Sequence, residues 1–186
     1  KAIFGFGDPN TSITNLVNNS GVIASNTTGV GTARSGLAAA PYGGDKAAFA
    51  YGSDHVNTKN LVTNLGVVGS DVTGVGTARS YLAAAGYGGD KGVFGYGYTG
   101  SNVSLKNLLG NNGVIAADVS GVGSARRGLA ASSYGGDKAI FGFGQISSYT
   151  AITNLVNSSG VIAADVSGVG TARGGNLAAA GYSYSA

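Results

Sequence analysis

The stretch "TARSGLAAAPYGGDKAAFAYG", residues 32–52, decides the fold. It has a run of alanines that ends in an aromatic residue, a tight Gly-Gly-Asp turn, and a second run that mixes Ala with Phe and Tyr. Glycine before the alanines and proline or glycine after them leave a helix too short to be stable. The stretch therefore predicts a β-hairpin.

The same phrase returns along the chain. It reappears as "TARSYLAAAGYGGDKGVFGYG" from Thr77 and as "SARRGLAASSYGGDKAIFGFG" from Ser124. A fourth copy, "TARGGNLAAAGYSYSA", starts at Thr171 and stops at its turn, while the matching second half, "KAIFGFG", stands at residues 1–7. We expect a single domain, residues 1–186, made of four repeats at approximately 1–45, 46–90, 91–137 and 138–186.

Each repeat is expected to contain four short strands. In the first repeat these are "KAIFGFG", "ITNLVN", "GVIAS" after an Asn/Ser-Gly turn, and the alanine-rich strand of the hairpin. A repeated four-stranded unit of this length is typical of a β-propeller blade. The sequence thus predicts an all-β fold, a β-propeller of four four-stranded blades.

The split hairpin suggests how the predicted ring closes. Pairing of Leu177–Tyr182 with Lys1–Gly7 would complete one blade from both termini and remove the open sheet edge. Two alternatives remain. Two chains can combine into an eight-bladed propeller, or each C-terminal strand can complete the first blade of the next chain and build a filament.

Three features of the repeat resemble the Kelch repeat. An Arg precedes a strand of small residues ("TARSGLAAA"), the next strand ends in Gly ("KAIFGFG"), and a polar turn leads to an outer strand ("ITNLVNNSGVIA"). The resemblance covers all four copies and implies a propeller. The near-identical copies are also similar in texture to repeats of bacteriophage tail-fibre and other virion proteins, which implies a structural role.

Composition narrows the function classes. The chain has 35 Gly and no Cys, Met or Trp, yet 43% of its residues are hydrophobic, so a packed fold is expected. The net charge of +3 is small and dispersed, which argues against nucleic acid as a partner. No apolar run approaches the roughly 18 residues that would span a bilayer, so no membrane insertion is expected.

Catalytic residue types are scarce. Glu is absent, His occurs once, and every Asp falls in an expected turn or loop. General acid–base chemistry and calcium binding both need denser clusters of such groups. We therefore expect neither an enzyme nor a cofactor or metal site.

Two periodic series are candidate binding residues. The arginines can bind carboxylates or phosphates, or else hydrogen-bond the carbonyls of a neighbouring blade, which is the favoured interpretation. The tyrosines before each turn can stack sugar rings or cover the hairpin, and covering is favoured. The members are Arg34, Arg79, Arg126 and Arg173, and Tyr42, Tyr87, Tyr134 and Tyr182. Phe4, Phe6, Phe49, Phe94, Phe141 and Phe143 are expected in the core between blades.

The segments that differ between copies are the loops after "FGFG" and its equivalents. Loops on a rigid scaffold commonly carry binding specificity, and we expect these to emerge on one side. The alternative is neutral drift of exposed loops. Their candidate binding residues are His55, Asn57, Tyr98, Asn102 and Tyr149.

The sequence therefore predicts a non-catalytic binding module for a glycan or a surface protein. The alternative is a structural subunit of a virion tail fibre or extracellular filament that assembles by strand exchange. Both place the protein on a virion or outside the cell, and both allow a homo-oligomer or a place in a larger assembly.

Overall fold

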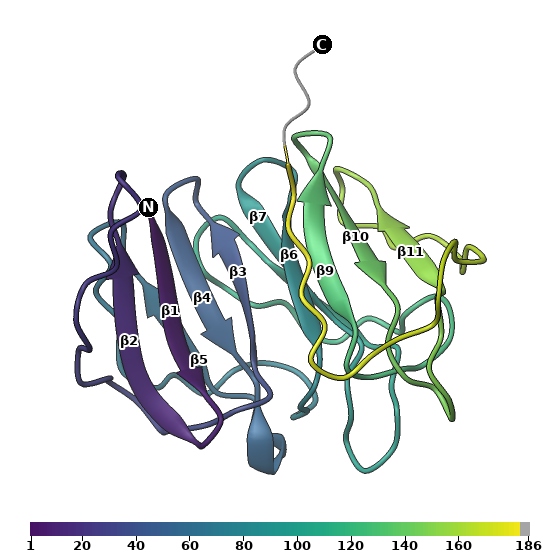
Figure 1. The fold of residues 1–186 in the computed structure, drawn as a ribbon, viewed down its shortest axis with the longest axis horizontal. Coiled ribbons are helices and arrows are strands. Elements are labelled where there is room, and N and C mark those ends of the chain that lie inside the picture. The colour runs from purple at the N-terminus through teal and green to yellow at the C-terminus, as the bar shows by residue number, and fades with distance from the viewer. Residues whose placement is uncertain (183–186) are drawn as a thin grey trace.

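The computed structural model describes residues 1–182 and shows four antiparallel sheets arranged side by side in a row (Figure 1). The first sheet has two strands and the other three have three strands each. A short 3-10 turn at Ser53–His55 follows the middle strand of the second sheet. The strands are β1 (Ala2–Gly7) and β2 (Thr11–Val17); β3 (Ala38–Tyr42), β4 (Lys46–Ala50) and β5 (Lys59–Val62); β6 (Ala83–Tyr87), β7 (Lys91–Gly95) and β8 (Lys106–Leu109); β9 (Ala130–Tyr134), β10 (Lys138–Gly142) and β11 (Thr153–Val156).

The predicted hairpin is confirmed in the second, third and fourth sheets. In the second sheet Ala38 lies opposite Ala50 and Tyr42 lies opposite Lys46, and the other two sheets repeat this register. Two glycines with positive φ, Gly43 (61°) and Gly44 (80°), make the turn. A residue with a side chain would be strained at both positions, which explains why the Gly-Gly pair recurs at each turn.

Neighbouring sheets pack face to face at short range, because the facing side chains are small. A Cβ added at Gly92 of β7 would lie 2.8 Å from the Cβ of Ala40 on β3. Backbone hydrogen bonds also join the hairpin turns, from Gly43 N to Asp90 O (2.8 Å) and from Gly88 N to Asp137 O (2.7 Å). Each sheet is thus held by the next one in the row.

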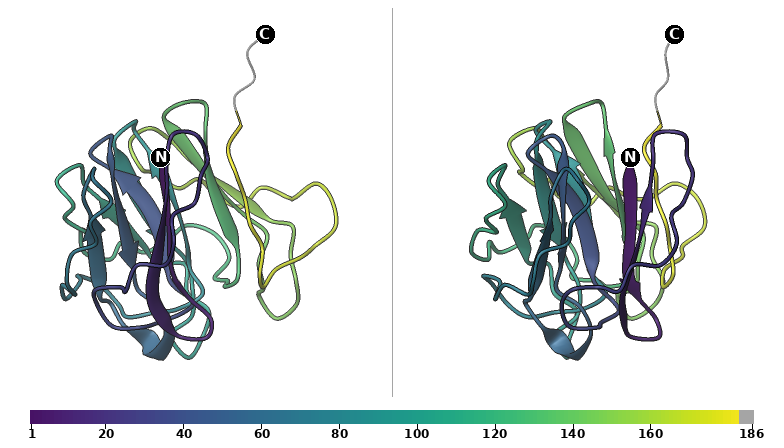
Figure 2. Two further views of the ribbon diagram at one scale, coloured as in Figure 1. Left: turned by 60° about the vertical axis from the view of Figure 1, so that its left-hand side comes forward. Right: turned by 90° about the vertical axis from the view of Figure 1, so that its left-hand side faces the viewer.

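The predicted propeller is wrong. The described residues form an open row of sheets that does not close into a ring, as the side views also show (Figure 2). A ring of four blades needs a quarter turn between neighbours, whereas the close face-to-face contacts and repeated turn-to-turn bonds keep successive sheets stacked.

The expected closure of the ring is also wrong. Among the described residues β1 pairs with β2 alone. The segment Leu177–Tyr182 instead runs beside β9, at the opposite end of the row from β1 (Figure 1). A Cβ added at Gly181 would lie 2.7 Å from Ser133 O on β9, so this segment stacks on the fourth sheet as β6 stacks on β3.

The expected outer strand of each blade, the "GVIAS" segment, is reduced to isolated bridges. Val62 and Lys59 of β5 each form one bridge, with Val68 and Val72, and the other sheets show equivalent pairs. Between the two bridges Gly69 N bonds Leu61 O (2.8 Å), but no continuous ladder forms. The "GVIAS" segments therefore cover β2, β5, β8 and β11 without completing four-stranded blades.

The core lies between the sheets and is built from alanines and aromatic rings. Phe49, Phe94 and Phe141 are buried there, as predicted. Phe4, expected in the core with them, is 60% exposed because no described residue covers its side of the first sheet. Phe6 and Phe143 are half-buried. The described residues contain no helix that is long and apolar enough to cross a membrane.

Candidate assembly interface

The junctions between sheets are built around the arginine series, and Arg79 is the clearest example. Its side chain is fully buried. Nε donates to Tyr96 O (2.9 Å), Nη1 to Thr77 O (3.1 Å) and Nη2 to Asn107 Oδ1 (2.7 Å). The guanidinium stacks 4.2 Å above the Tyr51 ring. One arginine therefore joins the second sheet, through Tyr51, to the third, through Tyr96 and Asn107.

A carboxylate completes this junction. Asp118 Oδ1 lies 4.0 Å from Arg79 Nη1 and accepts a hydrogen bond from Asn107 Nδ2 (2.9 Å). Asp118 Oδ2 accepts from both the backbone N (2.9 Å) and the hydroxyl (2.6 Å) of Thr77. Asp118, from the "DVSG" turn of one repeat, thus holds the segment of the preceding repeat that carries Arg79.

The same group recurs along the row. Arg34 bonds Tyr51 O (2.8 Å) and Asn60 Oδ1 (2.7 Å), lies 3.9 Å from Asp71, and stacks over Phe6. Arg126 bonds Phe143 O (2.9 Å) and stacks over Tyr96, but its Nη2 and the Oδ1 of Asn154 make no hydrogen bond among the described residues. These contacts fit the favoured interpretation, in which the arginines hold carbonyls of the neighbouring unit.

One strained residue in each unit lies at a junction, and in all units but the first it serves two. Tyr51 has φ 66°, unusual for a bulky residue, and Phe6, Tyr96 and Phe143 share this conformation. The carbonyl of Tyr51 accepts from Arg34, while its ring supports Arg79. The left-handed backbone points the carbonyl toward one arginine and the ring toward another. The contacts with both arginines hold the residue in this strained conformation.

The junction sets the protonation of its charged groups. Burial alone raises the pKa of Asp118, but hydrogen bonds from Thr77 and Asn107 and the charge of Arg79 outweigh it, so that the pKa lies below its ordinary value. The pKa values of Asp71 and Asp165 are lowered in the same way. Burial also lowers the pKa of Arg79, which stays charged at neutral pH because arginine starts so high.

The last arginine, Arg173, lacks most of this environment. It stacks 3.8 Å over the Phe143 ring, and Gly144 N donates to its carbonyl (2.9 Å), as at the internal junctions. Its guanidinium is exposed and donates from Nη1 to Thr171 O (3.2 Å). No asparagine or carboxylate of the described residues completes the group. We call this face, with Arg173 and the segment Ala178–Tyr182, the tail end.

The first sheet presents the complementary half, which we call the head end. Asn15 Nδ2 donates to Asn26 Oδ1 (2.9 Å) and to Ala24 O (3.1 Å), as Asn107 does to Asp118 and Ala116. No arginine of the described residues bonds this pair. The head end thus has the asparagine whose equivalents, Asn60 and Asn107, accept a hydrogen bond from an arginine. It has Asn26 where the other units have Asp.

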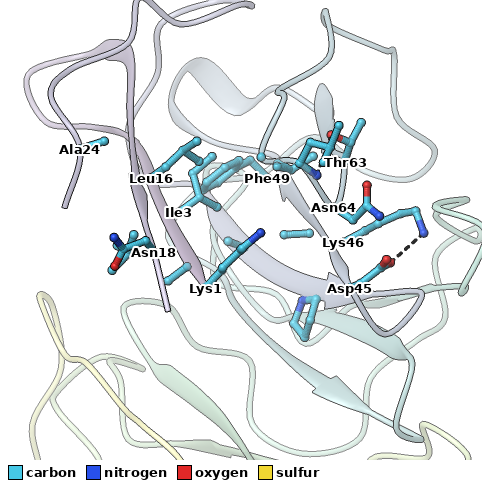
Figure 3. Close-up of a pocket in the computed structure, with 18 of the residues that line it drawn as sticks. Lys1, Ile3, Leu16, Asn18, Ala24, Asp45, Lys46, Phe49, Thr63 and Asn64 are labelled. Carbon is cyan, nitrogen blue, oxygen red and sulfur yellow. Dashed lines mark hydrogen bonds and ion pairs between the residues drawn. The ribbon is translucent and has the colours of Figure 1, made fainter. Parts of the chain in front are cut away.

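A large cavity opens between the first and second sheets. It has a volume of about 910 Å³, and residues from both strands of the first sheet and all three strands of the second sheet line it. Figure 3 shows the first sheet on one side of this space and the second sheet on the other, with the Lys46–Asp45 ion pair at its rim. The residues that line it include Ala2, Ile3, Leu16, Ala40, Pro41 and Phe49. In the other three sheets the alanine-rich first strand pairs with the edge of the middle strand that corresponds to the free edge of β1.

The tail end exposes side chains that are covered at internal junctions. Tyr42 and Tyr87 are each 5% exposed, because the turn of the next sheet packs on them at Gly113 and Gly160. Tyr134, the next member of that series, is 39% exposed. Leu155 and Tyr182 are exposed as well.

The loop residues singled out from the sequence lie mostly elsewhere. The loops after β4 and β10 leave the row at its lower edge in Figure 1. His55 lies edge-on to Tyr98 (5.7 Å between ring centroids), and Tyr149 is exposed. Asn57 and Asn102 use their amide NH₂ groups to hold backbone carbonyls, those of Gly74 and Gly76 and those of Gln145 and Ile146. The structure thus joins His55 with Tyr98 and ties the two asparagines into the scaffold.

The asparagine series was missed from the sequence. Asn15, Asn60, Asn107 and Asn154 recur with the spacing of the arginines and are buried or half-buried. A buried amide at each repeat needs a fixed partner, so this periodicity was the available signal. Within residues 1–182 no three His or Asp side chains gather where a metal ion could be held. No protein-family model matches the chain, and no curated protein is significantly similar to it in sequence.

Proposed function

We propose that this chain is a structural subunit that assembles head to tail, with the segment Ala178–Tyr182 of one copy completing the first sheet of the next. The observation that carries the proposal is the edge of β1 that no described strand pairs with, together with the segment Ala178–Tyr182, which lies on the fourth sheet and belongs to none of the described sheets. An open sheet edge next to an apolar cavity favours an added strand.

The register of such a pairing follows from the internal hairpins. Aligning the repeats places Tyr182 opposite Lys1 of the second copy and Ala178 opposite its Gly5, as Tyr42 lies opposite Lys46 and Ala38 opposite Ala50. The small residues of the segment suit this position, because the corresponding strands β3 and β6 also consist mainly of alanine. The bound segment would stack on β3 of the second copy as β3 stacks on β6.

Side chains outside the strand pair are complementary too. At internal junctions a ring packs on a small residue of the preceding middle strand, as Phe49 does on Gly5 and Phe141 on Gly95, at 3.1 and 2.8 Å from an added Cβ. Gly142 of β10 has no such ring, and a Cβ added there would meet only Thr153, at 3.5 Å. Phe4 of the second copy would cover Gly142.

This interface joins two different surfaces, so it does not close on itself after two copies. Heterologous contacts of this kind build open filaments when the rotation between copies does not close a ring. The repeated contacts between successive sheets in this chain form an open row. A second copy in the same relation would extend the row.

The test is the molar mass of the purified 186-residue chain, measured by light scattering over a wide concentration range and accompanied by electron microscopy. We expect mass to grow with concentration beyond a dimer and to give elongated particles. A constant mass of about 18 kDa at the highest concentrations would overturn the proposal.

Gly142 provides a matched pair of variants. Gly142→Leu should abolish association by filling the place of Phe4, while the folded monomer keeps its stability because little surrounds this position. Gly142→Ala should assemble like the original chain, since Ala50 stands at the same position and packs in one cluster with Phe94. Equal association of both variants would contradict the proposed contact.

The register has its own test, since the chain has no cysteine. Mixing Ile3→Cys with Ala180→Cys chains under oxidising conditions should give a disulfide between copies, because these residues lie opposite each other in the proposed pairing. Ala179→Cys is the control, because its side chain points to the other face of the strand. Equal cross-linking by the two cysteines would exclude this register.

A further inference from the structure

We infer that Arg173 of one copy docks on the Asn15–Asn26 pair of the next, and that the amide of Asn26 makes this junction the weakest in the assembly. The inference rests on the proposed head-to-tail assembly and names the residues that set its strength.

The docking of Arg173 follows from the three internal junctions. Its backbone and its stacking on Phe143 already match those of Arg34, Arg79 and Arg126. What is missing is the second half of the junction as Arg34 and Arg79 have it, namely the carbonyl of the aromatic residue, the asparagine Oδ1 and the carboxylate. In a second copy these positions are occupied by Phe6, Asn15 and Asn26.

Two of the three missing partners are chemically intact. The Phe6 carbonyl belongs to a left-handed residue (φ 63°), as the Tyr51 and Tyr96 carbonyls do, so it can accept from Nε of the incoming arginine. Asn15 uses its Nδ2 for Ala24 and Asn26, which leaves Oδ1 as the acceptor for Nη2. Arg34 and Arg79 use the equivalent asparagines in this way.

The third partner differs. Asp71 and Asp118 each supply two oxygens, one for the neighbouring asparagine and the other for the backbone N and hydroxyl of Thr32 or Thr77. Asn26 has a single oxygen, already bonded to Asn15. Its Nδ2 stands where a carboxylate oxygen should accept from Thr171, and a donor cannot accept from a backbone N–H.

The amide has two consequences for the junction between copies. The negative charge that faces each internal arginine is absent, and hydrogen bonds to a charged acceptor are replaced by at most a bond to the Thr171 hydroxyl. Assembled copies should therefore separate at this junction while the internal junctions stay intact. The substitution acts as a built-in point of reversible dissociation.

The experiment restores the internal pattern with Asn26→Asp and compares association constants by sedimentation velocity at fixed salt. We expect association to tighten about tenfold, in line with the gain from a charge-assisted hydrogen bond. Asn157→Asp is the matched control. It adds the same charge in a turn where Oδ1 accepts from Ser159 N and Val161 N, a role that a carboxylate keeps.

A double-mutant cycle assigns the gain to the arginine. In an Arg173→Ala background, Asn26→Asp should give a much smaller gain, because the charge it would face is gone. Raising the salt concentration should reduce the gain in the Arg173 chain.

The outcomes separate the two proposals. If the original chain assembles but Asn26→Asp tightens association no more than Asn157→Asp, the role of Asn26 is wrong and head-to-tail assembly stands. A gain that survives in the Arg173→Ala background would show that the introduced carboxylate acts on something other than the arginine, and would also overturn the inference. If neither the original chain nor Asn26→Asp associates, the assembly and the inference both fall.

Discussion

Arg79 and Arg173 begin the same repeated phrase and stack on the same kind of ring, yet the first is fully buried and the second is exposed. The difference lies in the neighbouring sheet on the C-terminal side of each arginine. Arg79 has a third sheet to supply a carbonyl, an asparagine and a carboxylate, and the described residues place no such sheet beyond Arg173. A repeat of this kind carries half of each junction and receives the other half from its neighbour.

The sharpest way to break this comparison is to remove both arginines in turn. Arg79→Ala should cost about 3 to 5 kcal/mol of unfolding free energy, because it leaves the buried Asn107 and the half-buried Asp118 without their cation. Arg173→Ala should cost less than about 1 kcal/mol, since an exposed cation–π contact is worth little. Urea unfolding at concentrations where the chain is monomeric measures both. Equal losses would mean that the internal junctions do not hold the row together.

The glycines beside the junction provide a second matched pair. Gly76 and Gly170 have nearly the same φ, 99° and 100°, so alanine should cost each about 1 to 2 kcal/mol in backbone strain. A Cβ at Gly76 would also press against the Asp118 carboxylate and lie 2.6 Å from Asn107 Nδ2, whereas nothing lies within 4 Å of one at Gly170.

Gly76→Ala should therefore lose about 1 to 2 kcal/mol more than Gly170→Ala, because overpacking adds to strain. Comparing the thermal unfolding of the two variants separates the cost of overpacking at the junction from the cost of backbone strain, which both variants share. A loss of the same size in both would show that the Asp–Asn pair can move aside freely.

The hairpin and the repeat were predictable from the sequence because local chemistry determines them. The Gly-Gly turn requires two residues with a left-handed backbone. The residues that flank the alanine run make any helix there too short to be stable. The relation between repeats was not predictable in this way. Ring or row depends on the angle between neighbouring sheets, which is set by how closely Gly92 approaches Ala40 and by bonds such as Gly43 N to Asp90 O.

Only part of the candidate interface could be predicted from the sequence. The arginine series stood out, and its structural interpretation fits the contacts of Arg34, Arg79 and Arg126. The partner of each arginine lies in the next repeat, for example 28 residues from Arg79 to Asn107, so local pattern could not connect them. The Asn at position 26, where the other repeats have Asp, gains a meaning only in the proposed junction with Arg173.

The smallest expected effect concerns acid, and it contrasts the three carboxylates with Asn26. The pKa values of Asp71, Asp118 and Asp165 are lowered in the folded chain, so the unfolded chain binds their protons more readily. Their contribution to stability is present above the ordinary Asp pKa, about 3.9, and is lost as pH falls through the lowered values.

Melting temperature should thus be flat near neutral pH and fall below about pH 4. Asp118→Asn should lower the melting temperature at neutral pH and make its acid decline shallower, because one linked proton is removed. A curve parallel to that of the original chain would show that Asp118 does not titrate with unfolding. Because Asn26 carries no proton to gain, the same fall in pH should weaken association in Asn26→Asp chains and leave that of the original chain nearly unchanged over the range in which the monomer stays folded.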